Sequence, residues 1–297
     1  AVEANRFNVL DEAYLYQGAT ALLGPEADDF RRRYKFHIAP ATDNRPYFFH
    51  FFKWDSLGEV LALRKRGGAG LIEWGYLVIV ATLAQAVVAG GLLILLPLAR
   101  ARRTWPTGTG GLMGSYFFLL GLAFLFIEIA FIQKFILFLS HPLYSVAVVL
   151  AAFLVFAGLG SRFSGILGRD AAVPVAVATI AAITVSYIAL LPTVFSLCMG
   201  LADGAKVAIS VALIAPLAFV MGMPFPLGLK RLAEGAGDFI PWAWGINGFA
   251  SVLSASLATL LAIEFWFTTV LFLAVAAYGG AALAIRRWKS APDRRHG

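Results

Sequence analysis

Charged residues are scarce in this chain of 297 residues, and cysteine is almost absent. Only 14% of the residues are charged, against about 25% in a typical soluble protein, and 60% are hydrophobic. The single cysteine, Cys198, excludes an internal disulfide and a cysteine-based metal cluster. The sequence also has no Walker motif, no nucleophile elbow and no HExxH motif, so none of these signatures of catalysis or metal binding is present.

Long apolar runs dominate what is there. Runs of about 20 residues, the length that crosses a bilayer, recur from Leu71 onward. Seven spans are predicted, at residues 71–98, 115–139, 142–160, 173–197, 207–227, 242–263 and 268–285. The predicted fold is an all-α membrane protein, a polytopic bundle of about seven transmembrane helices with a short soluble N-terminal segment. The lipid bilayer is the expected partner, and nucleic acid is not, because no basic stripe with interleaved aromatics occurs.

The chain divides into three predicted parts: a soluble or interfacial segment at residues 1–63, the bundle at 64–289 and a polar tail at 290–297. Residues 7–23 have mixed helical spacing, which Gly24-Pro25 interrupts. Asp43-Asn44 favours a turn, and an ion pair between Asp43 and Arg45 is a better interpretation of this polar pair than catalysis. Residues 48–63 mix aromatic and charged side chains, which predicts a helix lying in the plane of the membrane interface.

Several breaks and stripes shape the predicted spans. His141-Pro142 ends one helix, and Gly222-Met-Pro224-Phe-Pro226 predicts a kink or unwinding in the last third of the fifth span. The sixth span carries a small and polar stripe suited to close helix contact, formed by Asn247, Ser251, Ser254 and Ala258. An aromatic belt at the span ends is predicted from Trp74, Tyr76, Tyr116, Trp242, Trp244, Trp266 and Trp288.

The basic residues give conflicting information on orientation. Clusters follow spans one, three, five and seven: Arg100, Arg102 and Arg103; Arg162 and Arg169; Lys230 and Arg231; Arg286, Arg287 and Lys289. The positive-inside rule places all four clusters and the C-terminus in the cytoplasm of a bacterial inner membrane. Seven spans then place a fifth cluster, at residues 64–66, on the outside against the rule. Either the count is wrong by one, or this one cluster is an exception.

Glu128 is the strongest candidate for a functional residue, because it lies near the middle of a predicted span. A charged group there costs about 2.5–3.5 kcal/mol on insertion scales, so it should face protein or a wet cavity. It could relay a proton or bind a polar substrate, or it could be a structural carboxylate between helices. Gln85, Ser186 and Ser254 lie at the same depth, about 13–15 residues into their spans, and at least two are predicted to line a polar midplane site with Glu128.

The remaining candidates are secondary. Lys134 is six residues from Glu128, an offset that turns it away from the carboxylate, and snorkelling to the membrane surface explains it. Asn247 fits a helix-packing amide better than a ligand. His141 and Tyr144 fit a capped turn better than a metal site, because no second histidine is near in the sequence. Arg162 ends the motif Gly158-Leu-Gly160-Ser161-Arg162.

Several motifs together resemble the bacterial spermidine-synthase-like integral membrane proteins, also described as S-adenosylmethionine-dependent methyltransferase-like or fused major-facilitator/spermidine synthase proteins. They are Ala41-Thr-Asp43-Asn44-Arg45-Pro46-Tyr47-Phe-Phe, Ile127-Glu128-Ile-Ala-Phe-Ile-Gln133-Lys134-Phe, His141-Pro142-Leu-Tyr144-Ser, Gly158-Leu-Gly160-Ser161-Arg162, Met221-Gly222-Met-Pro224-Phe-Pro226-Leu-Gly228 and Trp244-Gly245-Ile-Asn247-Gly248. The resemblance covers most of residues 41–285.

The resemblance implies a catalytic domain upstream of Ala1, with residues 1 to about 45 forming its end. That domain, aminopropyltransferase-like or methyltransferase-like, would bind an S-adenosylmethionine-type nucleoside through a glycine-rich loop, which this chain lacks. No catalytic residue, cofactor or metal ligand is therefore expected here. The first interpretation is a non-catalytic membrane domain that anchors the enzyme-like domain and could supply it with a polar substrate. The alternatives are a major-facilitator-like half-bundle that transports a small cationic or polar solute, such as a polyamine, and a structural membrane subunit.

Overall fold

The computed structural model describes residues 14–47, 50–58, 74–100, 110–166 and 172–288, which form helices joined by short segments without a β-strand. The predicted all-α class is confirmed. The chain divides into two compact units. The N-terminal unit comprises residues 1–42 and 46–76, and the membrane unit comprises 43–45 and 77–297. The two units meet at residues 76/77, and the short stretch 43–45 belongs to the membrane unit. The division into a segment at residues 1–63 and a bundle at 64–289 stays a prediction.

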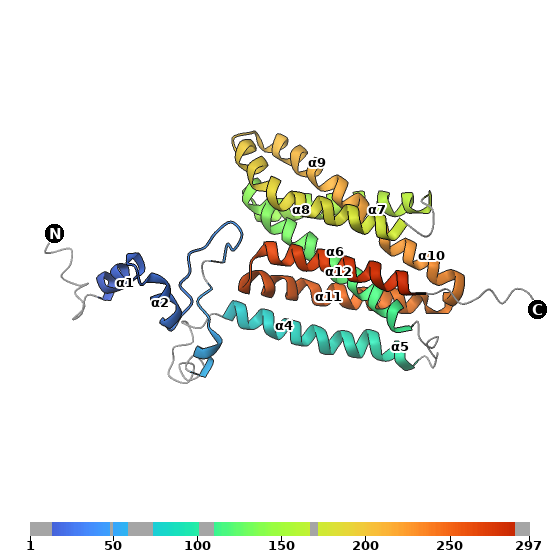
Figure 1. Ribbon diagram of the computed structural model, residues 1–297, viewed down its shortest axis with the longest axis horizontal. Helices are drawn as coiled ribbons and strands as arrows, with labels where there is room; N and C mark the ends of the chain where they lie inside the picture. The colour runs from blue at the N-terminus through green and yellow to red at the C-terminus, as the bar shows by residue number, and fades with distance from the viewer. Residues whose placement is uncertain (1–13, 48–49, 59–73, 101–109, 167–171, 289–297) are drawn as a thin grey trace, which may run out of the picture. The chain divides into compact units, whose positions relative to one another are not determined.

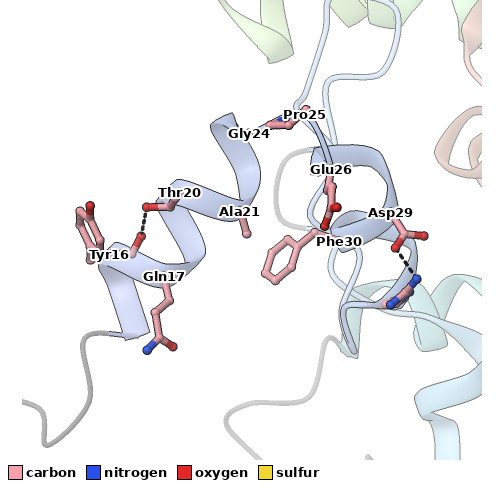
Figure 2. A pocket seen from close by; sticks show the side chains of 10 residues that line it. Tyr16, Gln17, Thr20, Ala21, Gly24, Pro25, Glu26, Asp29 and Phe30 are labelled. Atoms are coloured by element: carbon pink, nitrogen blue, oxygen red, sulfur yellow. Dashed lines mark hydrogen bonds and ion pairs between the residues drawn. The ribbon is translucent and has the colours of Figure 1, made fainter.

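The N-terminal unit contains helices α1 (Tyr14–Leu23) and α2 (Ala27–Arg33), separated at Gly24-Pro25 as predicted. The acidic residues of α2 lie in its first turn and the basic ones in its last turn, which favours the helix dipole. Residues of both helices and of the turn between them line a hollow of about 590 Å³, and Figure 2 shows their side chains. Tyr16 and Leu23 on α1 are 74% and 88% exposed, so α1 leaves much of its apolar surface uncovered.

The predicted in-plane helix at residues 48–63 is only partly described. Residues 50–53 are not helical, and a 3₁₀ helix, η1, covers Trp54–Ser56. The Lys53 ammonium donates hydrogen bonds to the carbonyls of Arg31, Arg32 and Tyr34, at 3.0, 3.1 and 2.6 Å. This lysine therefore satisfies carbonyls at the C-terminal end of α2 that the helix itself leaves without a donor.

The membrane unit is a set of long helices (Figure 1). In chain order the elements are α4 (Trp74–Gly90), which starts in the N-terminal unit, the π-helix η3 (Gly91–Leu95), α5 (Leu96–Arg100), α6 (Gly110–Leu139), α7 (Pro142–Phe163), η4 (Ser164–Ile166), α8 (Ala172–Cys198), α9 (Asp203–Met221), α10 (Pro224–Ala236), η5 (Gly237–Phe239), α11 (Ile240–Glu264) and α12 (Phe267–Arg287). The predicted ends at His141-Pro142 and at Gly222 are both present.

Six helical stretches are long and apolar enough to cross a membrane, by length and composition. One of them, Asp203–Glu264, is 62 residues long and contains α9, α10, η5 and α11. At about 1.5 Å per residue it is several times longer than a bilayer is thick, and it includes the fifth and sixth predicted spans. The prediction of about seven transmembrane helices is therefore close. The basic cluster at residues 64–66 lies outside the described residues.

Helix α6 forms the core of the membrane unit and packs against α11, α12 and α7. The small and polar stripe of α11 makes close helix contact, as predicted, and the helix that it contacts is α6. Ser254 and Ala258 of the stripe are fully buried, as is the neighbouring Ala250. A Cβ atom on Gly121 of α6 would lie 2.5 Å from the Asn247 carbonyl oxygen. Only glycine fits there, and small residues on both helices let the backbones approach closely.

Helices α7 and α9 cross even more closely. A Cβ atom on Gly160 would lie 1.7 Å from the Phe219 carbonyl oxygen, and one on Gly222 would lie 2.0 Å from the Ala157 carbonyl oxygen. Both contacts are with backbone, which a neighbouring side chain cannot relieve by rotating. The two glycines therefore fix this crossing, and two of the motifs in the sequence have a packing role.

The aromatic belt is only partly as predicted. Trp244 and Trp266 are 58% and 54% exposed, as a side chain in contact with lipid headgroups should be. Tyr116, Trp288 and Tyr76 are instead at most 5% exposed and belong to the packed interior of their units. Position near the end of an apolar run does not decide which way a ring points, because the helix face also matters.

Candidate functional site

Glu128 faces the interior of the membrane unit. It lies in the second half of α6 and is 6% exposed, while Ile127, Phe126 and Phe131 on the same helix are at most 1% exposed. The carboxylate is therefore surrounded by protein and not by acyl chains. This meets the condition set by the cost of placing a charge at the centre of a membrane.

A tyrosine on another helix lies within electrostatic range of Glu128. Tyr278 of α12 is 1% exposed and lies within electrostatic range of the Glu128 carboxylate. Tyr278 in turn interacts with Tyr116 of α6, which also interacts with Arg231 of α10. These four side chains form a series of polar groups through the interior of the unit, and we call them the buried polar series.

The far end of the buried polar series is tied to backbone. The Tyr116 hydroxyl donates a hydrogen bond to the Pro224 carbonyl, at the point where α9 gives way to α10. The Arg231 guanidinium donates to the Trp288 carbonyl and lies 5.8 Å from the centre of the Trp288 ring. A hydrogen bond from α6 therefore stabilises the helix break that the prolines predict. A hydrogen bond from α10 stabilises the C-terminal end of α12.

The predicted midplane layer does not form as expected. Ser254 is fully buried and donates to the Ala250 carbonyl at 2.7 Å and to the Leu122 carbonyl of α6 at 3.5 Å. Gln85 and Ser186, however, are exposed and do not share the protein interior with Glu128. Counting residues gives depth in the membrane, but it does not give the helix face, and both residues lie on outward faces of α4 and α8.

A second polar site lies at the other end of α6. Asp43 is within electrostatic range of Lys134, which is half-buried near the C-terminal end of the helix. The ion pairs among the described residues are all within α2, so the predicted Asp43–Arg45 pair is not formed. Asp43 is thus within electrostatic range of a lysine distant in the sequence, and the snorkelling of Lys134 stays a prediction.

Asn44 caps a helix more than 200 residues away. Its backbone carbonyl accepts a hydrogen bond from the Phe267 amide at 3.1 Å. Its side-chain oxygen Oδ1 accepts from the Thr268 amide at 3.1 Å and from the Thr268 hydroxyl at 3.0 Å. The residue at the N-cap position itself, Trp266, has a φ of 119° and makes no side-chain capping bond. The first amides of α12 are thus satisfied by the stretch 43–45, which we call the docking loop.

The other candidate residues take part in helix packing or capping, or lie on the surface. Asn247 Nδ2 donates to the Phe117 carbonyl at 3.1 Å, which is the helix-packing role predicted for it. His141 is at the N-cap position of α7 and its carbonyl accepts from Ser145, while Tyr144 is 45% exposed. Arg162 is exposed near the end of α7. Among the described residues no group of three His, Cys, Asp or Glu side chains could hold a metal ion.

The sequence did not identify Tyr278, Tyr116 or Asn44 as partners in a site. Tyr278 lies in an apolar run without a polar neighbour, and Tyr116 lies near a span end, where a belt residue is the natural expectation. The signal for Asn44 was its turn, which is a local feature and does not reveal a partner at Thr268.

Comparison with protein-family models, with curated proteins and with solved structures finds no match to this chain.

Proposed function

We propose that this chain is the membrane domain of a spermidine-synthase-like protein and that it anchors an enzyme-like domain encoded upstream in the same polypeptide. The observation that carries the proposal is the docking loop. Asn44 lies within the motif at residues 41–49 that resembles the link between the two domains of that family. This link is held by the bundle at α12 through Asn44, and Asp43 lies within electrostatic range of Lys134 on α6. A domain attached to such a link would have a fixed point on the membrane.

Two further features support an anchor. Tyr16 and Leu23 leave apolar surface uncovered on α1, and a neighbouring domain would cover it. The surroundings of Glu128 on α6 are closely packed with fully buried aromatic and aliphatic side chains. A secondary transporter needs its binding site to open to either side in turn, which this packing does not favour.

The first experiment tests the upstream domain. The full-length gene product should contain a glycine-rich nucleotide loop about 150–200 residues before Ala1, the size of one domain. The purified full-length protein should bind S-adenosylmethionine or its decarboxylated form in a calorimetric titration. A gene product without such a domain, or one that binds neither nucleoside, would contradict the proposal.

The second experiment distinguishes the anchor from a transporter of small cationic solutes, the alternative that the buried Glu128 keeps open. Proteoliposomes containing the protein and its Glu128→Gln variant are loaded with buffer and given radiolabelled putrescine or spermidine. An anchor accumulates neither polyamine above empty vesicles. Accumulation that the Glu128→Gln variant abolishes would establish transport and displace the anchor proposal.

The proposed location is the bacterial inner membrane with the C-terminus in the cytoplasm. Figure 1 shows α5, α10 and the C-terminal end of α12 at the same end of the membrane unit, and that end carries Arg100, Lys230 and Arg286, all exposed. The positive-inside rule favours a cytoplasmic position for this basic end. A green fluorescent protein fused after Gly297 should fluoresce, and alkaline phosphatase fused there should be inactive. The reverse pattern would refute this orientation.

A further inference from the structure

An apolar groove lies on the membrane unit between the π-helix η3, α6 and α11. It has a volume of about 530 Å³, within the usual size of small-molecule sites. The groove is lined by Leu95, Gly111, Gly114, Ser115, Phe118, Leu119, Ile246 and Phe249. Every residue of this lining except Ser115 is apolar or glycine, so the groove suits a hydrocarbon ligand.

The local backbone explains why the groove exists. A Cβ atom on Gly90 would lie 2.5 Å from the Phe249 ring, so α4 and α11 touch just before η3 begins. The chain then changes to π-helix over Gly91–Leu95, a rare geometry that often marks functional positions. On α6, a Cβ atom on Gly111 would meet nothing within 4 Å, and one on Gly114 would meet only Ile246, at 3.7 Å. The two glycines therefore leave space that a side chain would fill.

The length and position of the groove match one leaflet of a bilayer. Its lining on α6 extends from Gly111 to Leu119, a rise of about 12 Å, against about 15 Å for half of the hydrocarbon core. It begins in the first turn of α6, which starts at Gly110. The groove thus runs from the basic end of the membrane unit toward the middle of the bilayer and does not cross it.

A positive charge stands beyond the outer end of this groove. Arg100 is exposed and is the last residue of α5, which continues directly from η3. It lies five residues after Leu95, or about 7.5 Å further along the helix axis. Its axial level is that of the lipid headgroups, and arginine binds a phosphate with paired hydrogen bonds.

We propose that this groove binds one acyl chain of an anionic phospholipid from the leaflet at the basic end, with its phosphate on Arg100. The groove lies in membrane-spanning stretches, so hydrocarbon chains are the molecules that surround it. The charge of Arg100 selects an anionic headgroup over a zwitterionic one. The lipid would fill the space between η3, α6 and α11, and this inference does not depend on the proposed anchoring function.

Native mass spectrometry of the detergent-purified protein tests the proposal with phosphatidylglycerol and phosphatidylcholine as probes. One basic residue near the surface gives roughly a five-fold preference for anionic lipid. The protein should bind phosphatidylglycerol at least about five-fold more tightly, and Arg100→Gln should reduce this preference to near unity. Arg162→Gln, which changes an exposed arginine on α7, is the matched control and should keep the preference.

Filling the groove provides the second measurement. Gly114→Phe should lower the affinity for both lipids at least ten-fold, and Gly114→Leu is a smaller variant in case the larger one fails to fold. Gly158→Phe, at an exposed glycine of α7 with no atom within 4 Å of its Cβ position, is the control and should bind lipid normally. Equal binding of the two lipids by the unaltered protein, or unchanged binding by a folded Gly114 variant, would overturn the proposal.

Discussion

Replacing Asn44 tests the docking loop on which the anchoring proposal rests. In Asn44→Ala the backbone bond to Phe267 remains, but both bonds from Thr268 to the Oδ1 atom are lost. Loss of an N-cap side chain costs about 1 kcal/mol, and a polar bond in a helical membrane protein is worth about 0.6 kcal/mol. Their sum, about 1.6 kcal/mol, should lower the melting temperature by about 3–6 °C in a protein of this size.

The matched variant is Asn44→Asp, which keeps an acceptor oxygen at the same position. A carboxylate at a helix N-terminus gains about 0.3–1 kcal/mol from the helix dipole, so this variant should melt at or above the temperature of the unaltered protein at neutral pH. Thermal unfolding in detergent, followed by tryptophan fluorescence, measures both shifts. A double-mutant cycle with Thr268→Val should give a coupling energy of about 0.6 kcal/mol or more.

Two results would refute this reasoning. Equal melting temperatures for Asn44→Ala and the unaltered protein would show that the cap contributes nothing. Equal losses in Asn44→Ala and Asn44→Asp would show that the acceptor oxygen is not what matters. In either case the docking loop would not be the fixed attachment that the anchor requires.

Three further substitutions probe the packing of the membrane unit. Gly160→Ala should destabilise the unit by about 1–3 kcal/mol, because the added methyl group overpacks the helix crossing. The control Gly158→Ala should be neutral or stabilise it by up to about 1 kcal/mol through helix propensity. Equal effects on the melting temperature would contradict the close crossing of α7 and α9. Thr184→Val should be neutral or stabilising, because the buried Thr184 hydroxyl makes no hydrogen bond among the described residues; a loss above about 1 kcal/mol would reveal a partner. Tyr116→Phe should cost about 1 kcal/mol because it removes the hydrogen bond from the hydroxyl to the Pro224 carbonyl. An unchanged melting temperature would show that this bond does not hold the helix break.

Where helices start, end and break could be predicted from sequence, because these features depend on local chemistry. Pro142 begins α7 and Pro224 begins α10, as prolines at the first turn of a helix do. The close contact of α11 with α6 was also predictable, since small residues recur along one face of α11 at helical spacing. Such a pattern identifies an interface even when the rest of the helix is uniformly apolar.

The face that each polar residue occupies could not be predicted in this way. In a soluble helix, the alternation of polar and apolar residues shows which side is buried. A helix in lipid is apolar on the side that faces protein and on the side that faces acyl chains, so this signal is lost. Gln85 and Ser186 have the depth in the membrane expected of partners of Glu128, but they lie on the outward faces of their helices. Tyr278 lies on the inward face of α12, but no pattern in the sequence identifies it.

Polar groups lie near both α6 and α12 at two levels of the membrane unit. The docking loop binds Thr268 on α12 and lies within electrostatic range of Lys134 on α6, and Glu128 on α6 lies within electrostatic range of Tyr278 on α12. Apolar surface alone does not hold helices together in lipid, because acyl chains solvate it equally well. Polar groups near the end and in the interior therefore favour one arrangement of α6 against α12. A buried carboxylate with this role needs no transported solute to account for it, which favours the anchor.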